Sequence, residues 1–118
     1  MYRFTIAAVT FATALSFIPA SAGEASVTVT GSAPARSGPA QVLAVTVAYG
    51  DLDLTKADGA AALLDRIERA SRRVCGERAG YVMDSMRTRT FDTCRARATR
   101  YAVMTVDAPQ LTQIAASR

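Results

Sequence analysis

The chain contains no histidine, and only two of its 118 residues are cysteines. The lack of histidine excludes Ser-His-Asp and Cys-His catalysis, histidine-ligated haem and the usual zinc hydrolase sites, because each of these needs an imidazole. The two cysteines do not form a CxxC pair, which excludes the low-pKa thiol motif of thioredoxin-like enzymes. We therefore expect a protein that is not an enzyme and that holds no metal and no cofactor.

Charge is missing from the first hydrophobic run. Residues 4–18 carry no charge, Arg3 precedes them, and Pro19 breaks the run just before the small residues of Ala20-Ser21-Ala22. This layout is typical of a signal peptide that is cleaved after Ala22. A transmembrane helix is the alternative, but fifteen residues are fewer than the roughly 20 that span a bilayer. We expect residues 1–22 to be a signal peptide, the mature protein to be periplasmic or secreted, and no transmembrane segment to remain.

The mature chain is short. Removing 22 of the 118 residues leaves 96, and the formal net charge falls from +4 to +3 because Arg3 is lost. A chain of this length buries only about 60 to 65% of its unfolded surface, so a covalent link would add a useful margin of stability. Export would place Cys75 and Cys94 in an oxidising compartment, where one pairing is possible. The sequence predicts a Cys75–Cys94 disulfide, with a free or reactive thiol as the alternative.

Residues 23–40 are predicted to be a flexible N-terminal segment. Ser26-Val-Thr-Val-Thr30 alternates apolar and polar β-branched residues and could form a short strand. The next ten residues are rich in Gly, Ser and Pro, which is typical of a connection. The ordered core is therefore expected to start after Ala40, with residues 41–118 as a single small domain.

That domain is predicted to begin with a strand over residues 41–49. Its larger side chains alternate with smaller ones and should face the core: Leu43, Val45, Val47 and Tyr49. A helix over residues 56–75 follows, with Thr55 and Asp58 as a variant of the capping box and Gly76 as the residue that ends it. Its apolar side chains share one face, while Arg66, Arg69 and Arg73 lie opposite.

The second half of the domain is predicted to be helical as well. After a loop over residues 76–88, a helix over residues 90–106 would place one stripe of residues toward the core: Phe91, Cys94, Ala98, Tyr101 and Thr105. Asp107 and Pro109 should stop it, and residues 110–116 could form a last short helix. The predicted fold class is α+β and mainly helical, with one or two N-terminal strands packed on a disulfide-linked antiparallel helix hairpin and a short C-terminal helix.

The order of these features resembles the UrcA family of small secreted proteins of Gram-negative bacteria. The resemblance covers about residues 42–114 and depends on residues in a fixed order: Val45, Val47, Tyr49, Asp51-Leu-Asp-Leu54, Leu64, Arg66, Ile67, Val74-Cys-Gly76, Cys94, Ala98, Ala102-Val103, Ala108-Pro109 and Leu111. It implies an exported, two-cysteine helical domain. It transfers no catalytic residue.

Two motifs could in principle bind a metal ion. Asp51-Leu-Asp53 offers two carboxylates, but Ca²⁺ and Mg²⁺ sites normally need more oxygen ligands, and burial of Leu52 and Leu54 explains the alternation. Met83, Met86 and Met104 could bind Cu(I), although methionine more often fills gaps in a core. We expect a structural role for both motifs.

Arginine is the dominant base, with ten copies from Arg66 to Arg100. One interpretation is a solvated helix face with intrahelical pairs such as Asp65–Arg69 and Glu68–Arg72. The alternative is an anion-binding surface for lipopolysaccharide, anionic lipid or an acidic partner, made by Arg66, Arg69, Arg73, Arg97 and Arg100. Nucleic acid is not expected, since no aromatic residues interleave with these arginines.

The sequence as a whole favours a non-enzymatic envelope protein that acts by contact with a protein partner, which the sequence does not identify, or with its own copies. Its few helices leave the predicted strand incompletely covered. This favours dimerisation through the face of Leu43, Val45, Val47 and Tyr49 or through the exposed edge of that strand. The alternative function is the arginine-rich anion-surface binder, with peripheral contact to anionic lipid.

Overall fold

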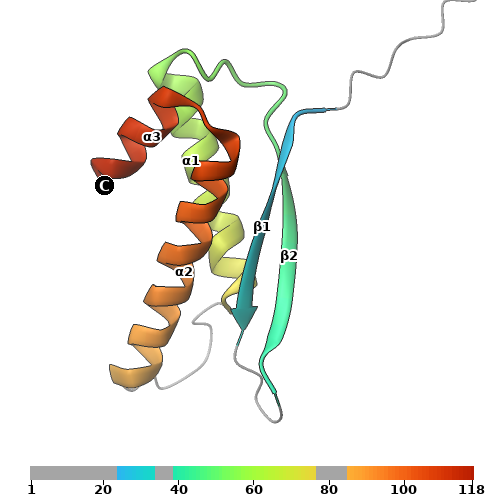
Figure 1. Ribbon diagram of the computed structural model, residues 1–118, viewed down its shortest axis with the longest axis vertical. Helices are drawn as coiled ribbons and strands as arrows, with labels where there is room; N and C mark the ends of the chain where they lie inside the picture. The colour runs from blue at the N-terminus through green and yellow to red at the C-terminus, as the bar shows by residue number, and fades with distance from the viewer. Residues whose placement is uncertain (1–23, 34–38, 77–84) are drawn as a thin grey trace, which may run out of the picture.

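The computed structural model describes residues 24–33, 39–76 and 85–118. Figure 1 shows the elements of this part: β1 (Ser26–Ala33), β2 (Gln41–Ala48), α1 (Ala57–Val74), α2 (Ser85–Val106) and α3 (Pro109–Ala116). The fold is α+β and mainly helical, which confirms the predicted class. The predicted signal peptide at residues 1–22 lies outside the described residues, as do Tyr81 and Met83.

The two strands form an antiparallel hairpin, with Ser26 opposite Ala48 and Ala33 opposite Gln41. Val27 and Val29 of β1 are 3% and 0% exposed and belong to the hydrophobic core. The expectation that the ordered core starts after Ala40 is therefore wrong. Val27 and Val29 alternate with exposed polar residues, so one side of β1 is buried. This holds even though Gly31 follows directly.

The predicted inward face of β2 is largely confirmed. Val47 is buried, and Val45 and Tyr49 are partly buried against the core. Leu43 is 39% exposed, because it lies opposite Gly31 near the end of the hairpin, which runs beyond the last turn of α1 (Figure 1). The opposite face of the hairpin is exposed along its whole length.

α1 buries the apolar face that its sequence predicts, including Leu63, Leu64 and Ile67. Gly76 has φ +82, the left-handed conformation expected of a residue that ends a helix. The predicted capping box is wrong. The helix begins after Lys56, with no side-chain cap, because the backbone N–H and the hydroxyl of Thr55 both donate to the Asp53 carboxylate instead.

α2 begins at Ser85, earlier than the predicted start at residue 90. The residues between them include no glycine or proline that would end a helix. The predicted core stripe of α2 is correct at Phe91 and Ala98 but wrong at Tyr101, which is 59% exposed, and at Thr105, which is exposed.

The orientation of α2 explains this difference. Thr99 meets Ser71 of α1, with their hydroxyl oxygens 2.9 Å apart, so the side of α2 that faces α1 runs through Thr99 and the buried Val103. Successive helical residues are rotated by about 100°, which turns Tyr101 away from this side. Met104, the one methionine with a described side chain, is 65% exposed and does not fill a gap in the core.

α3 begins at Pro109, as the first helical residue, and buries Leu111 against the core. Asp107, with φ 52, ends α2 just before it, so the predicted break at Asp107 to Pro109 is confirmed. Figure 1 shows the hairpin as one layer against the antiparallel helices α1 and α2, with α3 folded back beside α1. Among the described residues, α1 contacts both strands, whereas α2 contacts β1 and not β2.

Candidate functional site

The disulfide joins the two long helices at the place where β1 packs against them. Cys75 and Cys94 are bonded, with their Cα atoms 5.8 Å apart, which confirms the predicted pair. Cys75 follows the last residue of α1, and Cys94 lies in the first half of α2. The bridge therefore fixes the end of one helix against the side of the other.

β1 rests on this bridge at Gly31. A Cβ atom at Gly31 would lie 2.6 Å from Cγ2 of Val74 and 3.1 Å from Sγ of Cys75, so only glycine allows the strand to approach so closely. The Sγ atom of Cys94 lies 3.6 Å from the carbonyl oxygen of Ser32. β1, α1 and α2 therefore all meet at the disulfide.

The two carboxylates of the Asp51-Leu-Asp53 motif are both engaged by protein groups. Arg66 donates two hydrogen bonds to Asp51, at 2.8 and 2.7 Å, and a third to the carbonyl oxygen of Ala48 at 2.9 Å. Asp53 accepts from Thr55. Leu52 and Leu54 are partly buried, as the structural interpretation of the motif expects. Across the described residues, no three His, Cys, Asp or Glu side chains gather where they could hold a metal ion.

The Arg66–Asp51 pair makes stability depend on pH. The hydrogen bonds from Arg66 hold the pKa of the Asp51 carboxyl below its ordinary value of 3.8. A carboxyl with a lowered pKa stabilises the fold above its unfolded pKa, and this stabilisation is lost as the pH falls through the folded pKa. We expect Asp51→Asn to lower the melting temperature by a few degrees near neutral pH and to have less effect below about pH 3.

Melting curves of Asp51→Asn and wild type from pH 7 to pH 2 measure this difference. Glu24→Gln, which changes an exposed residue before β1, is the control and should show no such convergence with pH. A difference in melting temperature that stays constant over the whole range would contradict a role for the ionised pair.

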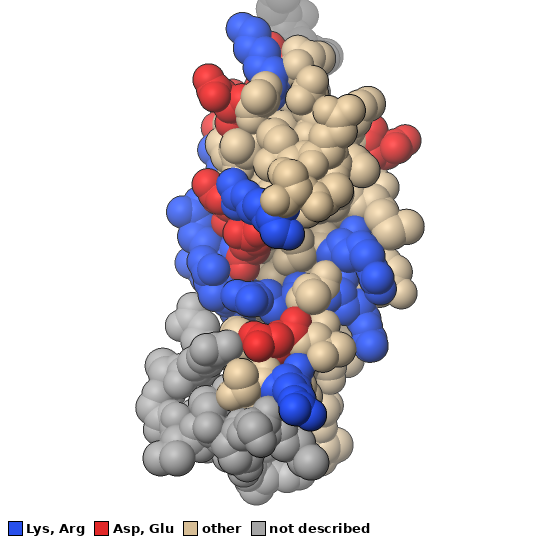
Figure 2. Space-filling model, turned by 90° about the vertical axis from the view of Figure 1, so that its left-hand side faces the viewer, with Lys and Arg blue, Asp and Glu red and all other residues tan. Residues whose placement is uncertain are grey.

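The arginines proposed as an anion-binding surface do not form one uniform patch. Arg66 is committed to Asp51 and Ala48, while Arg69, Arg73, Arg97 and Arg100 are exposed on α1 and α2. Figure 2 shows Asp and Glu side chains between and beside the Lys and Arg side chains on the helical side of the molecule. The helical side of the molecule therefore carries charges of both signs.

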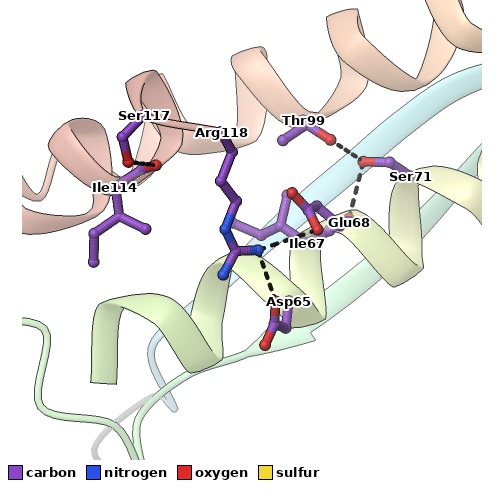
Figure 3. A network of polar contacts seen from close by, with 8 residues as sticks. All are labelled: Asp65, Ile67, Glu68, Ser71, Thr99, Ile114, Ser117 and Arg118. Atoms are coloured by element: carbon purple, nitrogen blue, oxygen red, sulfur yellow. Dashed lines mark hydrogen bonds and ion pairs between the residues drawn. The ribbon is translucent and has the colours of Figure 1, made fainter. Parts of the chain in front are cut away.

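The C-terminal residue organises part of this mixed surface, as Figure 3 shows. Arg118 donates to Asp65 at 2.9 Å and lies 3.4 Å from Glu68. Its hydrogen bond to Asp65 lowers the pKa of that carboxyl. The Ser117 hydroxyl donates to the carbonyl oxygen of Ile114 and caps the C-terminal end of α3, one residue before Arg118. Asp65 and Glu68 form ion pairs with Arg118 in place of the predicted Arg69 and Arg72, although Arg69 still attracts Asp65 electrostatically. Sequence spacing could not reveal the contacts of Arg118, because this residue lies far along the chain.

In the described sheet each strand has one outer edge with no strand partner; α2 lies beside β1, and the outer edge of β2 lies away from α2. The Tyr49 N–H donates to the carbonyl oxygen of Ala25 at 2.8 Å, so the odd-numbered residues of β2 point their backbone groups toward β1. Antiparallel strands alternate, and the even-numbered residues therefore point outward. Arg66 occupies the carbonyl oxygen of Ala48. Within the described ranges, no hydrogen bond reaches the backbone groups of Val42, Ala44 and Thr46, which we call the free edge.

The side chains of β2 are unusual for a strand whose outer edge has no partner strand. Edges are normally protected from further pairing by charged residues, proline or a bulge. Here β2 has no charged residue and no proline, and its register with β1 is continuous. The side chain of Val42, whose backbone belongs to the free edge, is 79% exposed. Figure 1 shows β2 on the outer side of the hairpin, away from α2. Among the described elements, α1 contacts β2, and its Arg66 reaches this edge at the carbonyl oxygen of Ala48.

None of the described helices is both long enough and apolar enough to cross a membrane. No family model, curated protein or solved structure matches the chain. The resemblance to the UrcA family therefore stays a prediction from the sequence.

Proposed function

We propose that this protein is an exported, non-enzymatic envelope protein that binds an extended polypeptide segment along the free edge of β2. The observation that carries the proposal is an uncharged strand edge whose outward backbone groups at Val42, Ala44 and Thr46 have no partner within the described chain. An added strand would satisfy these groups, and the side chains beside them would supply specificity.

The rest of the fold supports a binding role of this kind. The hairpin is held on α1 by Val27, Val29 and Val47, and the disulfide fixes the helices beneath it. A rigid edge loses little conformational entropy when it binds. The disulfide also fits an oxidising compartment, such as the periplasm or the medium, which the predicted signal peptide and the resemblance to UrcA proteins favour.

The alternative of anion binding by the arginines has less support. Arg69, Arg73, Arg97 and Arg100 are exposed, and in the described part of the chain none of them forms an ion pair with a carboxylate, although Arg69 is close enough to Asp65 to help lower its pKa. The acidic residues beside them weaken the field that would attract lipopolysaccharide or anionic lipid. Arg66, the fifth residue, already has its partners.

Photo-crosslinking in the native host tests the proposed edge. A photoreactive phenylalanine derivative replaces Val42 beside the free edge or, as the control, the exposed Tyr101 on α2. We expect a covalent adduct from position 42 and none from position 101. Ala44→Pro should abolish the adduct, because it removes an outward N–H without breaking the β1–β2 hydrogen bonds.

Unchanged crosslinking in Ala44→Pro would contradict strand addition, provided that the variant still melts cooperatively. Equal crosslinking from positions 42 and 101 would also contradict it, because only position 42 lies on the hairpin.

A further inference from the structure

We infer that the segment that pairs with the free edge is β2 of a second copy of this chain, in an antiparallel register centred on Ala44. This inference rests on the proposed function and names its partner. The result would be a four-stranded sheet in which the two β2 strands lie side by side at the centre and the β1 strands lie outside.

The free backbone groups fix the register. In an antiparallel pair, the residues whose N–H and C=O groups point toward the other strand must face one another. With Ala44 opposite the partner's Ala44, Val42 lies opposite the partner's Thr46. Every N–H and C=O of the free edge then has a partner in both copies, and none is left over.

Arg66 makes this register better than its neighbours. A shift of two residues in one direction would place Val42 opposite the partner's Ala48, whose carbonyl oxygen already accepts a hydrogen bond from Arg66 at 2.9 Å. A shift in the other direction would place Thr46 opposite Ala40, which lies before the strand begins. The free stretch between these limits has Ala44 at its centre.

The side chains suit a copy of the same strand. A strand that meets its own copy repeats every charge it carries, and like charges directly opposite one another are destabilising. β2 carries none. In this register Leu43, which is 39% exposed, would lie opposite the partner's Val45, which is also only partly buried. Pairing would therefore cover the apolar side chains that the hairpin leaves accessible.

The two-fold axis gives a test that a different partner cannot reproduce. Because residue 44 would face residue 44, Ala44→Lys or Ala44→Glu alone would create a like-charge pair across the axis. A mixture of the two variants would create an opposite-charge pair. Ala48→Lys is the matched control, because it changes another exposed alanine on the same side of β2, next to the carbonyl that Arg66 occupies.

Sedimentation equilibrium of the mature protein, from micromolar to millimolar concentration, measures the association. We expect wild type and Ala48→Lys to have the same dimer dissociation constant. The dissociation constant of each charged variant at position 44 should be roughly fivefold higher than that of wild type. The mixture should associate about tenfold more tightly than either charged variant alone. Monomeric wild type at every concentration would overturn the inference, and so would equal effects at positions 44 and 48 or a mixture that shows no rescue.

The mass of the adduct from position 42 separates the two proposals. An adduct of twice the mass of the chain supports pairing with a second copy. An adduct that contains another protein overturns the self-pairing but leaves strand addition standing. The absence of any adduct overturns both.

Discussion

Replacing Cys75 and Cys94 together with alanine should lower the free energy of unfolding by about 3 kcal/mol. The bond links residues 19 apart in the sequence, and releasing a loop of this length restores that much conformational freedom to the unfolded chain. For a domain of 60 to 100 residues, this corresponds to a fall in melting temperature of roughly 12 to 24 °C. Alanine is the suitable replacement, because Cys75 is 1% exposed and a serine hydroxyl there would be buried.

Thermal and urea unfolding of the mature protein measure this effect. Wild type with its disulfide reduced should unfold like the double alanine variant, since both lack the same crosslink. Met104→Ala is the control, because it changes an exposed residue of the same helix and should leave stability within about 0.5 kcal/mol. A double variant that melts within about 2 °C of the oxidised wild type would show that packing, without the bridge, holds the helices together.

The features that the sequence predicts correctly are those with a local cause. The apolar face of α1 repeats with the period of a helix, β2 alternates with the period of a strand, and Gly76 takes the left-handed conformation that ends α1. The Cys75–Cys94 bond is also predictable, because only one pairing exists. In the first three cases the neighbouring residues decide the outcome, whereas the disulfide is predictable because the composition leaves one possible pair.

The features that the sequence does not predict depend on contacts between distant residues. Arg118 meets Asp65 across 53 residues, and Arg66 meets Asp51 across 15, and no spacing rule connects either pair. Tyr101 is exposed because the Ser71–Thr99 contact sets the rotation of α2. Similarly, the sequence shows that β2 lacks charge, but the packing of β1 and α2 decides which edge of the hairpin is free.

Removing residues 24–39 should abolish cooperative folding of the mature chain. The sequence places these residues outside the core, whereas the structure places Val27 and Val29 inside it. Full burial of a valine contributes about 1.5 to 3 kcal/mol, so the two together contribute roughly 3 to 6 kcal/mol. The loss of β1 also removes every β1–β2 hydrogen bond. A typical domain is stable by only about 5 to 15 kcal/mol, and the truncated chain would lose most of that margin.

Circular dichroism melting of residues 24–118 and 40–118 distinguishes a structural β1 from a flexible extension. Point variants locate the effect within the strand. Val29→Ala should destabilise by roughly 1 to 3 kcal/mol, because it leaves a cavity between the hairpin and the helices. The neighbouring Thr28→Ala faces solvent and should change stability by less than about 1 kcal/mol. A truncated chain that melts as cooperatively as the longer one would mean that α1, α2 and α3 fold without the hairpin, and β2 would then have no fixed edge to offer a partner.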